Sequence, residues 1–297
     1  MKIANCKAGE RNFVGLFYED KMLNISKAIH IYSSIYEKTS KNVDKIDDLL
    51  YIDDLREYLR KVFDFILEHN FIYTLTEEKF KYLPPILKPQ KILALGRNYS
   101  EHAKELGHKI PKEPVFFSKA PSSLIGHEDK IVYPSFLTRV DPEVELGVII
   151  KKKGKYIKEE DAWDYVLGYT IVNDVTARDM QAEDFQNTNP WFRSKSFDTF
   201  CPIGPFLVFK EDLKEPHNLN IELRVNGEVR QKDNTKNMLF KIPQIISYIS
   251  KHLTLEAGDI IATGTPSGIA PINPGDVVEC LVEKVGVLRN KVVEEKL

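Results

Sequence analysis

The sequence predicts an α+β protein in which a small N-terminal α+β domain precedes a β-rich domain. Three observations lead to this fold class. After residue 90, short apolar or alternating runs follow one another with turn residues between them. Few helical segments interrupt those runs, whereas residues 44–70 carry a strong helical pattern. Because strands dominate, we expect the second domain to close into a barrel or to fold into a sandwich.

The predicted N-terminal domain covers residues 1–88. Apolar residues between Asp44 and Asn70 recur at helical spacing, and acidic residues occupy the opposite face. This pattern predicts a helix with one buried face and suggests no chemistry. The following segment, Leu83–Pro89, cannot be helical throughout, because proline removes donors and constrains its predecessor. We therefore place the second domain at residues 89–297.

Strands and two helices account for most of the predicted second domain. Turn signals such as Asn226-Gly227 and Pro274-Gly275 separate some of the strands. Helices are expected near Ala177–Phe185 and Pro243–Lys251. The predicted strands are Lys91–Leu95, Val115–Phe117, Val144–Ile150, Val166–Val172, Phe206–Phe209, Ile221–Val225, Asp259–Ala262 and Val277–Val282.

Composition and charge exclude several classes of protein. The chain has 297 residues, of which 42% are apolar, so it can bury a core and is not intrinsically disordered. Lys and Arg number 42 and Asp and Glu 44, a net charge of −2 that leaves no electrostatic footprint for nucleic acid or an anionic membrane. We therefore expect a protein that binds neither.

The remaining global features point to the cytoplasm. The sequence contains no uncharged apolar run of about 18 residues, the length that a membrane span requires. Its start lacks the apolar region of a signal peptide. The three cysteines, Cys6, Cys201 and Cys280, are far apart and form no CxxC motif, which fits a reducing compartment. We expect a soluble cytoplasmic globular protein.

The segment Asp141–Ile150 holds the strongest local signal for chemistry. Residues two apart in a strand face the same side, so Glu143 and Glu145 converge while Val144 and Leu146 face the other side. Two adjacent carboxylates repel each other unless a cation lies between them, and Mg²⁺ and Mn²⁺ prefer such oxygen ligands. The alternative is a solvent-facing strand edge, or glutamates paired with a neighbouring lysine.

Asp174 is a third candidate ligand. It follows a buried-looking strand and precedes a predicted helix, which Thr176 and Asp179 would begin as a capping box. Arg178 and Gln181 would then share one face of the first turn and suit an anionic, oxygen-rich ligand beside the cation. Alternatively, Asp174 caps the helix and pairs with Arg178.

A general-base pair is predicted on a short helix that Asn98 caps and Gly107 ends. His102 and Glu105 are three residues apart and share one face of this helix. An imidazole held by a carboxylate can take a proton from water near neutral pH. Residues 106–112, which follow, are expected to form a lid. The alternative is an ion pair on the protein surface.

Three further residues are candidates for the site. Lys195 lies among aromatic residues and could place its charge on a developing enolate, the alternative being a surface lysine. Lys119, which also follows aromatic residues, could act in the same way. Thr265 belongs to a Gly/Pro turn that lacks the GK[ST] ending of a phosphate loop, so nucleotide binding is not expected.

Together these motifs resemble those of the fumarylacetoacetate hydrolase family. They occur in the family's order, and the resemblance covers residues 90–297. The motifs are Asn98-Tyr99-x-x-His102-x-x-Glu105, Glu143-x-Glu145-Leu146, Asn173-Asp174-x-Thr176-Ala177-Arg178-Asp179-x-Gln181, Lys195-Ser196-Phe197 and Gly264-Thr265-Pro266.

The resemblance implies a rolled, mixed β-sheet of roll or barrel type after a smaller α+β domain, assembled as a homodimer. It implies that Glu143, Glu145 and Asp174 bind Mg²⁺ or Mn²⁺, and that His102 and Glu105 lie on a lid and activate water. Lys119 matches a lysine near the catalytic water, and Lys195 also has a catalytic role. The residues expected to contact the substrate are Tyr99, Arg178, Gln181, Lys195 and Thr265.

Residues 97–99 lack the additional metal-binding carboxylate of the fumarylacetoacetate hydrolases proper. The resemblance is closer to the branch of acylpyruvases, oxaloacetate decarboxylases and 2-hydroxyhepta-2,4-diene-1,7-dioate isomerases. We expect a Mg²⁺- or Mn²⁺-dependent hydrolase that cleaves a C–C bond in a small 2,4-dioxo carboxylate through a metal-stabilised enolate. Alternatives at the same site are isomerisation, decarboxylation and sugar-acid dehydration. An alternative of another class is a non-catalytic module that binds a metal–carboxylate complex.

Overall fold

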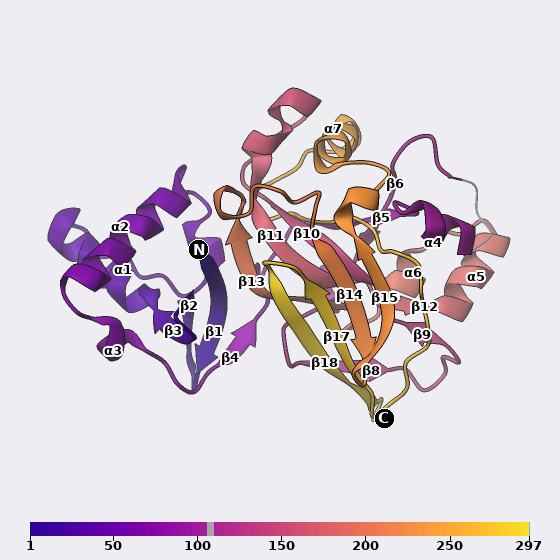
Figure 1. Cartoon of the computed structure of the whole chain (residues 1–297), viewed down its shortest axis with the longest axis horizontal. Coiled ribbons are helices and arrows are strands. Elements are labelled where there is room, and N and C mark those ends of the chain that lie inside the picture. Colours follow the sequence, from indigo (N-terminus) through magenta and orange to yellow (C-terminus); the bar gives the residue numbers. More distant parts are fainter. Residues whose placement is uncertain (106–109, 297) are drawn as a thin grey trace.

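The computed structural model describes residues 1–105 and 110–296 and shows a small N-terminal lobe beside a larger body (Figure 1). In the lobe, the helices lie beside a hairpin of strands. The elements of the lobe are β1 (Lys2–Ala8), β2 (Arg11–Tyr18), β3 (Lys21–Asn24), α1 (Ile25–Tyr36), the 3₁₀ helix η1 (Ile46–Leu49), α2 (Leu55–Glu68), α3 (Ile72–Leu75) and β4 (Lys81–Leu83).

The body contains two groups of strands, with short helices at the right of the view in Figure 1 and α7 near its top. Its elements are β5 (Ile92–Gly96), α4 (Ser100–Glu105), β6 (Val115–Lys119), η2 (Pro121–Ser123), β7 (Leu124–Ile125), β8 (Lys130–Tyr133), β9 (Val140–Asp141), β10 (Val144–Ile150), η3 (Glu159–Tyr165), β11 (Val166–Asn173), β12 (Thr176–Ala177), α5 (Arg178–Gln186), α6 (Phe192–Lys195), β13 (Cys201–Phe209), η4 (Lys210–Asp212), β14 (Asn220–Val225), β15 (Glu228–Asn234), η5 (Thr235–Asn237), α7 (Ile242–His252), β16 (Ile260–Ala262), β17 (Val277–Val282) and β18 (Gly286–Glu294).

The strands form a large mixed sheet and a smaller one that packs on it. The large sheet has the order β3-β2-β1-β13-β11-β10-β16-β5-β6, and the five-stranded sheet has the order β15-β14-β17-β18-β8. Most pairs are antiparallel, but β16–β5, β18–β8 and β13–β7 are parallel. Within residues 1–105 and 110–296, the first and last strands of each sheet do not pair with each other, so both sheets are open. The α+β class is therefore confirmed, and the two sheets form a sandwich, not a closed barrel.

Apolar side chains fill the space between the two sheets. Strands β10, β11 and β13 contact β14, β17 and β18. One buried cluster combines residues of the large sheet, such as Leu146 and Ile171, with Leu223 and Val278 of the small sheet. Strict alternation along β14 and β17, with every second residue buried, supplies the inner face of the small sheet.

The N-terminal lobe shares a sheet and a core with the body. Strand β1 pairs with β13, since Lys2 lies opposite Val208 and Ile3 opposite Leu207. A second buried cluster joins lobe residues such as Leu59 to Leu207 on the other face of the large sheet. The proline-rich segment after β4 contains no helix, as predicted. The domain boundary at residue 88 stays a prediction, because the large sheet contains strands from both sides of that residue.

The pattern between Asp44 and Asn70 predicts one helix, and this prediction is wrong in one respect: the chain forms two separate helices there, the 3₁₀ helix η1 and then α2. The carboxylate of Asp54 accepts a hydrogen bond from the backbone N–H of Glu57, which begins a new helix at Leu55. The two expected helices of the body are confirmed as α5 and α7, and the eight expected strands all form, with shifted ends at six of them.

Four chain segments meet at one edge of the large sheet. Strands β5 and β16 are parallel, with Ala94 opposite Ala262, while β10 is antiparallel to β16 and β11 is antiparallel to β10. The residues that follow β5, β11 and β16 therefore lie at the same edge as the residue that precedes β10. This edge collects most of the residues that the sequence marked as candidates.

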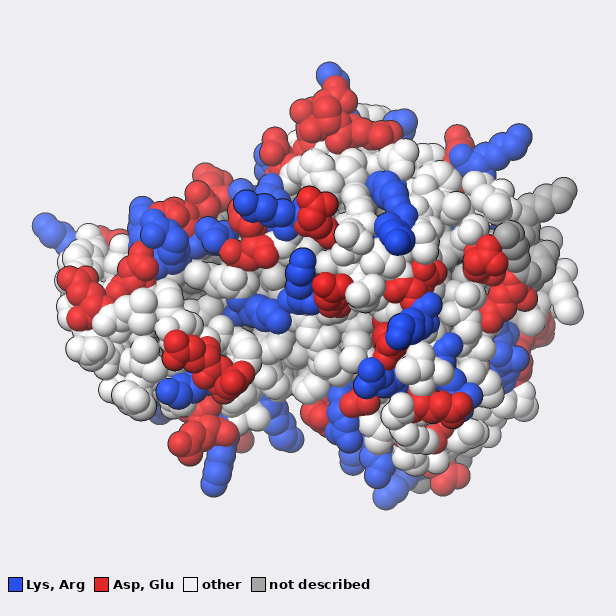
Figure 2. Space-filling model, viewed as in Figure 1, with Lys and Arg blue, Asp and Glu red and all other residues white. Residues whose placement is uncertain are grey.

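The molecular surface has mixed charge. On the face shown in Figure 2, Lys and Arg side chains are interspersed with Asp and Glu over both the lobe and the body. This face therefore offers no continuous basic surface of the kind that binds nucleic acid. In the described part of the chain, no helix has the length and apolar character needed to cross a membrane.

We predict that Gly168→Ala destabilises the fold. Gly168 lies in β11 opposite Phe209 of β13, and a Cβ there would overlap the backbone carbonyl oxygen of Val208, which the sheet holds in place. The expected loss of unfolding free energy is about 1–3 kcal/mol or more, measured by urea denaturation. Gly9→Ala is the comparison variant: its Cβ meets no atom within 4 Å, so only the strain of an alanine at a φ of +59° should lower its stability, by roughly 1 kcal/mol, and the loss in Gly168→Ala should exceed it. An equal loss in both variants would contradict the packing argument.

Candidate active site

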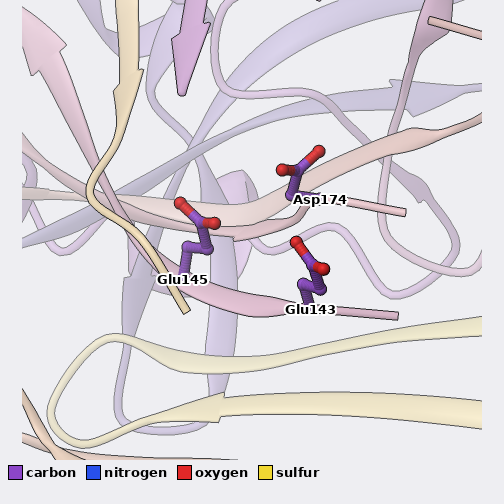
Figure 3. Close-up of side chains that lie close together, drawn as sticks. All are labelled: Glu143, Glu145 and Asp174. Carbon is purple, nitrogen blue, oxygen red and sulfur yellow. The ribbon is translucent and has the colours of Figure 1, made fainter. Parts of the chain in front are cut away.

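Three carboxylates converge where β10 begins and β11 ends (Figure 3). Their ligand atoms lie within 4.8 Å of one another, and Glu143, Glu145 and Asp174 are 3%, 1% and 1% exposed. The backbone N–H of Glu143 donates to Asn173 Oδ1 at 2.9 Å, and that of Asp174 donates to the Glu143 carbonyl at 2.8 Å. These bonds fix the two strand ends together. The prediction that Glu143 and Glu145 share one side is confirmed, and the surface alternative is wrong.

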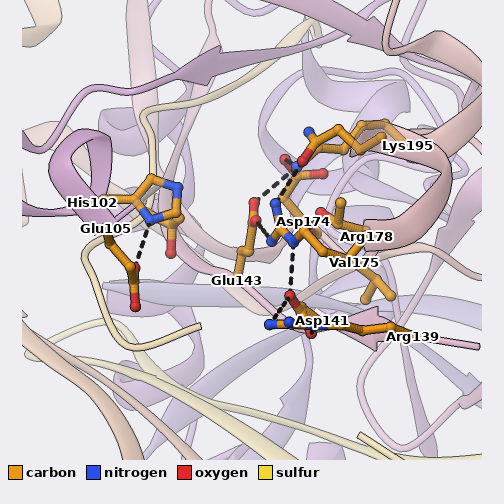
Figure 4. Close-up of polar contacts among 12 residues, drawn as sticks. His102, Glu105, Arg139, Asp141, Glu143, Asp174, Val175, Arg178 and Lys195 are labelled. Carbon is orange, nitrogen blue, oxygen red and sulfur yellow. Dashed lines mark hydrogen bonds and ion pairs between the residues drawn. The ribbon is translucent and has the colours of Figure 1, made fainter. Parts of the chain in front are cut away.

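Buried cations lie directly beside two of these carboxylates (Figure 4). Lys195 Nζ donates to Glu143 Oε2 at 2.8 Å and to Asp174 Oδ2 at 2.6 Å. Lys119 Nζ donates to Asp174 Oδ1 at 2.5 Å, and Arg178 pairs with Glu143. Lys195 is 2% exposed and Lys119 is fully buried, so the alternative that Lys195 is a surface lysine is wrong.

The electrostatic environment differs between the two glutamates. Burial raises the pKa of Glu143, but the charges of Lys195 and Arg178 outweigh it and hold that pKa well below its usual range. Burial, together with the negative charges of Asp174 and Glu143, raises the pKa of Glu145 well above its usual range. The backbone N–H of Gly264 donates to Glu145 and offsets only part of this shift.

These observations fit a divalent cation. Three carboxylates of this spacing are a donor set that Mg²⁺ and Mn²⁺ accept. Within residues 1–105 and 110–296, Glu145 forms no ion pair with the lysines and arginine that contact Glu143 and Asp174. The residues that would hold the ion are Glu143, Glu145 and Asp174. The wider cluster contains the four cations Lys119, Arg139, Arg178 and Lys195 and the four acids Asp141, Glu143, Glu145 and Asp174.

A cavity of about 320 Å³ opens onto this cluster. It is within the size range of small-molecule sites. Glu143 and Asp174 reach its wall, whereas Glu145 and Lys119 are not among the lining residues. The cavity is lined by Leu95, Gly96, Arg97, His102, Phe117, Glu143, Asp174, Arg178, Gln181, Ala182, Phe185, Gln186, Trp191, Lys195 and Thr265.

His102 and Glu105 bring a proton-transfer pair to the same cavity. His102 Nδ1 lies 3.3 Å from Glu105 Oε2. His102 is only 5% exposed whereas Glu105 is exposed, so the alternative of an ion pair on the surface describes the carboxylate but not the imidazole. Burial raises the pKa of Glu105, but hydrogen bonds from His102 and the backbone N–H of Gly268 outweigh it and lower that pKa. The bond to Gly268 also ties α4 to the loop after β16.

The cap expected for α4 is wrong. The helix begins at Ser100, and the side chain of Asn98 instead accepts from the Phe240 N–H and donates to the carbonyls of Phe240 and Thr263. Asn98 thus links three loops at the sheet edge. The expected helix end at Gly107, and residues 106–109 of the expected lid, lie outside the described residues.

The first turn of α5 supplies Arg178 and Gln181, as predicted. Arg178 donates through Nε to Asp141 Oδ2 at 2.7 Å and through Nη1 to Gln181 Oε1 at 2.6 Å. The expected capping box is wrong, because Thr176 Oγ1 donates to the Asp174 carbonyl. Pairing of β12 with β9, next to Asp141, sets the start of this helix instead. The alternative that Asp174 pairs with Arg178 does not occur.

Two further predicted residues lie in different surroundings. Thr265 lines the cavity, and its Oγ1 accepts from Gln231 Nε2 at 2.9 Å. Tyr99 is 1% exposed and does not line the cavity, and its hydroxyl has no hydrogen-bond partner in the described part of the chain. A direct contact of Tyr99 with substrate therefore has no support in this geometry.

Sequence reasoning missed Asp141 and Arg97. Asp141 is fully buried and accepts from both Arg139 and Arg178, which fixes the guanidinium of Arg178. Its position two residues before Glu143 was a usable signal. Arg97 follows an apolar strand and lines the cavity, and a charged residue at a strand end was the signal for it.

Comparison with known proteins agrees with this geometry. The sequence model of the family described as fumarylacetoacetate (FAA) hydrolase, C-terminal, matches residues 91–293. The chain belongs to the fumarylacetoacetate hydrolase family. The matched region contains each of the ligand, cation and proton-transfer residues described above.

Relatives within this family include proteins with different described activities. An uncharacterized protein of Methanocaldococcus jannaschii is 53% identical over 71% of this chain and 86% of its own length. The mitochondrial oxaloacetate tautomerase FAHD2A of Homo sapiens is 45% identical over 74% of this chain and 71% of its own. Maleylpyruvate hydrolase from Sphingobium sp. SYK-6 has a TM-score of 0.78 at 29% identity, over 99% of this chain and 100% of its own.

We predict that Glu145→Gln weakens binding of Mg²⁺ and Mn²⁺ by more than about 100-fold, measured by isothermal titration calorimetry. A unit charge about 4 Å from a cation contributes on the order of 4 kcal/mol at an effective dielectric constant of about 20. The exposed Glu228 supplies the matched control, Glu228→Gln, which should bind the ion as the wild type does. Wild-type affinity in Glu145→Gln would exclude Glu145 as a ligand.

Proposed function

We propose that this protein is a metal-dependent enzyme that interconverts the keto and enol forms of a small 2-oxo dicarboxylate such as oxaloacetate. One observation carries the proposal. A single cavity is lined by Glu143 and Asp174 of the three clustered acids, by Lys195 and Arg178, and by His102 of the His102–Glu105 pair. Acid–base chemistry and charge stabilisation are thereby available to one small ligand.

The cluster supplies what a 2-oxo acid needs for enolisation. A bound Mg²⁺ or Mn²⁺, held by Glu143, Glu145 and Asp174, would act as a Lewis acid toward the 2-oxo group. Arg178 and Gln181 bind carboxylate and oxo oxygens through N–H donors at the cavity wall. Lys195 places its ammonium where negative charge develops on the enolate oxygen. Burial lowers the pKa of Lys195, but the charges of Asp174 and Glu143 outweigh it, so the amine stays protonated.

His102 moves the proton. When Nδ1–H donates to Glu105, the other ring nitrogen, Nε2, is unprotonated and can accept a proton from carbon 3 of the substrate. The enolate oxygen takes a proton from water to give the enol, and the imidazolium releases its proton to solvent. In the opposite direction of the reaction, Nε2 returns a proton to carbon 3. In the view of Figure 4, His102 lies on one side of Glu143 and Lys195 on the other. The similarity to an oxaloacetate tautomerase at 45% identity supports this reaction.

The test is the rate at which enolic oxaloacetate converts to the keto form, followed by the ultraviolet absorbance of the enol. We expect catalysis with Mg²⁺ or Mn²⁺, none with a chelator, and a rate about 100- to 10,000-fold lower in His102→Gln. His30→Gln, on the exposed side of α1, is the matched control and should keep the wild-type rate. Undiminished activity with the chelator or in His102→Gln would refute the proposal.

A second candidate is hydrolysis of a C–C bond in a 2,4-dioxo carboxylate of the acylpyruvate or fumarylpyruvate type. The observation in its favour is the contact between the buried His102 and the exposed Glu105, a pair that can deprotonate a water molecule. The maleylpyruvate hydrolase has the same fold. Water adds to carbon 4, and the C3–C4 bond then breaks. Its electrons form the enolate of pyruvate, which takes up a proton, while the acyl part leaves as a carboxylic acid.

Acetylpyruvate distinguishes the two candidates. Hydrolysis yields acetate and pyruvate, and in ¹⁸O-water the acetate carries the label, which NMR and mass spectrometry detect. Glu105→Gln should lower this rate by about 100-fold or more, because the imidazole loses its carboxylate partner. Absence of acetate alongside rapid enolisation of oxaloacetate would exclude the hydrolase. Absence of turnover with every 2-oxo acid tested would favour a binding module.

A further inference from the structure

We propose that Arg97 binds the second, non-reacting carboxylate of the substrate, so that the cavity selects 2-oxo dicarboxylates over 2-oxo monocarboxylates. The inference rests on the proposed function, which assigns the 2-oxo end of the ligand to the acidic cluster. It adds the chemical group that recognises the other end.

Arg97 is a cavity arginine without an anionic partner. Its guanidinium carbon lies 5.3 Å from the ring centroid of Trp191 and 5.9 Å from that of Phe185. Its Nε is buried and has no hydrogen-bond partner, and Arg97 forms no ion pair with residues 1–105 or 110–296. Burial lowers the pKa of this guanidinium. A desolvated donor left unpaired is costly, so the site fits one more anion.

The other cavity arginine, Arg178, differs in this respect. Its nitrogens already donate to Asp141, Glu143 and Gln181. Arg178 is therefore held in the acidic cluster, whereas no hydrogen bond joins the guanidinium of Arg97 to the residues that the structure describes. A planar guanidinium with free N–H groups is the side chain best suited to bidentate binding of a carboxylate.

An aromatic wall separates the two charged ends of the cavity. Lys195 Nζ lies 5.1 Å from the ring centroid of Phe117, and the rings of Phe117 and Trp191 are 5.6 Å apart at 71°. Trp191 in turn carries the Arg97 guanidinium on its face. Two cations thus flank two rings. The cavity thus presents a cation, an aromatic wall and a second cation in that order. A ligand with an oxygen-rich group at each end and a short carbon chain between them would fit this arrangement.

The backbone holds Arg97 in place before any ligand arrives. Its φ is +61°, in the left-handed region that residues other than glycine rarely adopt. The neighbouring Asn98 fixes the chain here through its bonds to Phe240 and Thr263. Phe185 lies on α5, the helix that also carries Arg178 and Gln181. One helix therefore contributes to both ends of the cavity.

The test compares two pairs of acids that differ only in the second carboxylate: 2-oxoglutarate with 2-oxopentanoate, and oxaloacetate with 2-oxobutanoate. Affinities are measured by isothermal titration calorimetry on the full chain with Mg²⁺ present. We expect the wild type to prefer the diacid of at least one pair by about 10- to 100-fold, the range for hydrogen bonds to charged groups. Arg97→Met should abolish that preference while leaving the affinity for the monoacid unchanged.

Two further variants complete the design. Arg97→Lys keeps the charge but loses the planar fork, so it should retain part of the preference. Arg60→Met removes an exposed arginine of α2 and should leave every affinity unchanged. The inference is overturned if the wild type prefers neither diacid, or if Arg97→Met weakens diacid and monoacid equally. Because affinity is the readout, a lost preference and a failure to enolise oxaloacetate are separate results.

Discussion

Buried carboxylates that lie within 4.8 Å of one another must be matched by positive charge, and this constraint organises the body of the protein. Lys195 of α6 bridges Glu143 and Asp174, Lys119 of β6 contacts Asp174, and Arg178 of α5 connects Glu143 to Asp141. Each partner comes from a different element. The pairing of β10 with β11 places the acids close together. The short helices α5 and α6, which follow β12, lie where Arg178 and Lys195 contact those acids.

The same balance prepares the site for chemistry. The cluster contains four cations and four acids, so its net charge is zero when all eight groups are ionised. A bound divalent ion would raise that net charge to +2. A dicarboxylate substrate carries a charge of −2 and would balance it. Enolisation and C–C hydrolysis both pass through an enolate and use the same charge stabilisation. They differ in whether His102 takes a proton from carbon or from water. Arg97, two rings away from Lys195, adds recognition of the far end of the ligand.

Much of the fold and the site was predictable because the signals were local. Alternation in Glu143-Val144-Glu145 placed both carboxylates on one side, and the interval from His102 to Glu105 placed both on one helical face. Capping was less predictable. Asn98 and Thr176 have short polar side chains that favour helix starts. Asn98 instead bonds to backbone groups of Phe240 and Thr263, which the fold brings near, and Thr176 bonds to the carbonyl of Asp174, two residues before it. Asp141 and Arg97 were missed because their roles depend on partners distant in sequence.

The sequence by itself determined the α+β class, the eight strands of the body, the three acids and the pair on α4, since periodicity and spacing follow from bond geometry within one segment. Tertiary structure decided the rest. It joined the lobe to the body through β1 and β13, left the sheets open, and buried Lys195 between two acids. It also placed Arg97 at the cavity wall, where it forms no ion pair with the described residues. Burial and ion pairing depend on which segments meet, and the packing of distant strands sets those meetings.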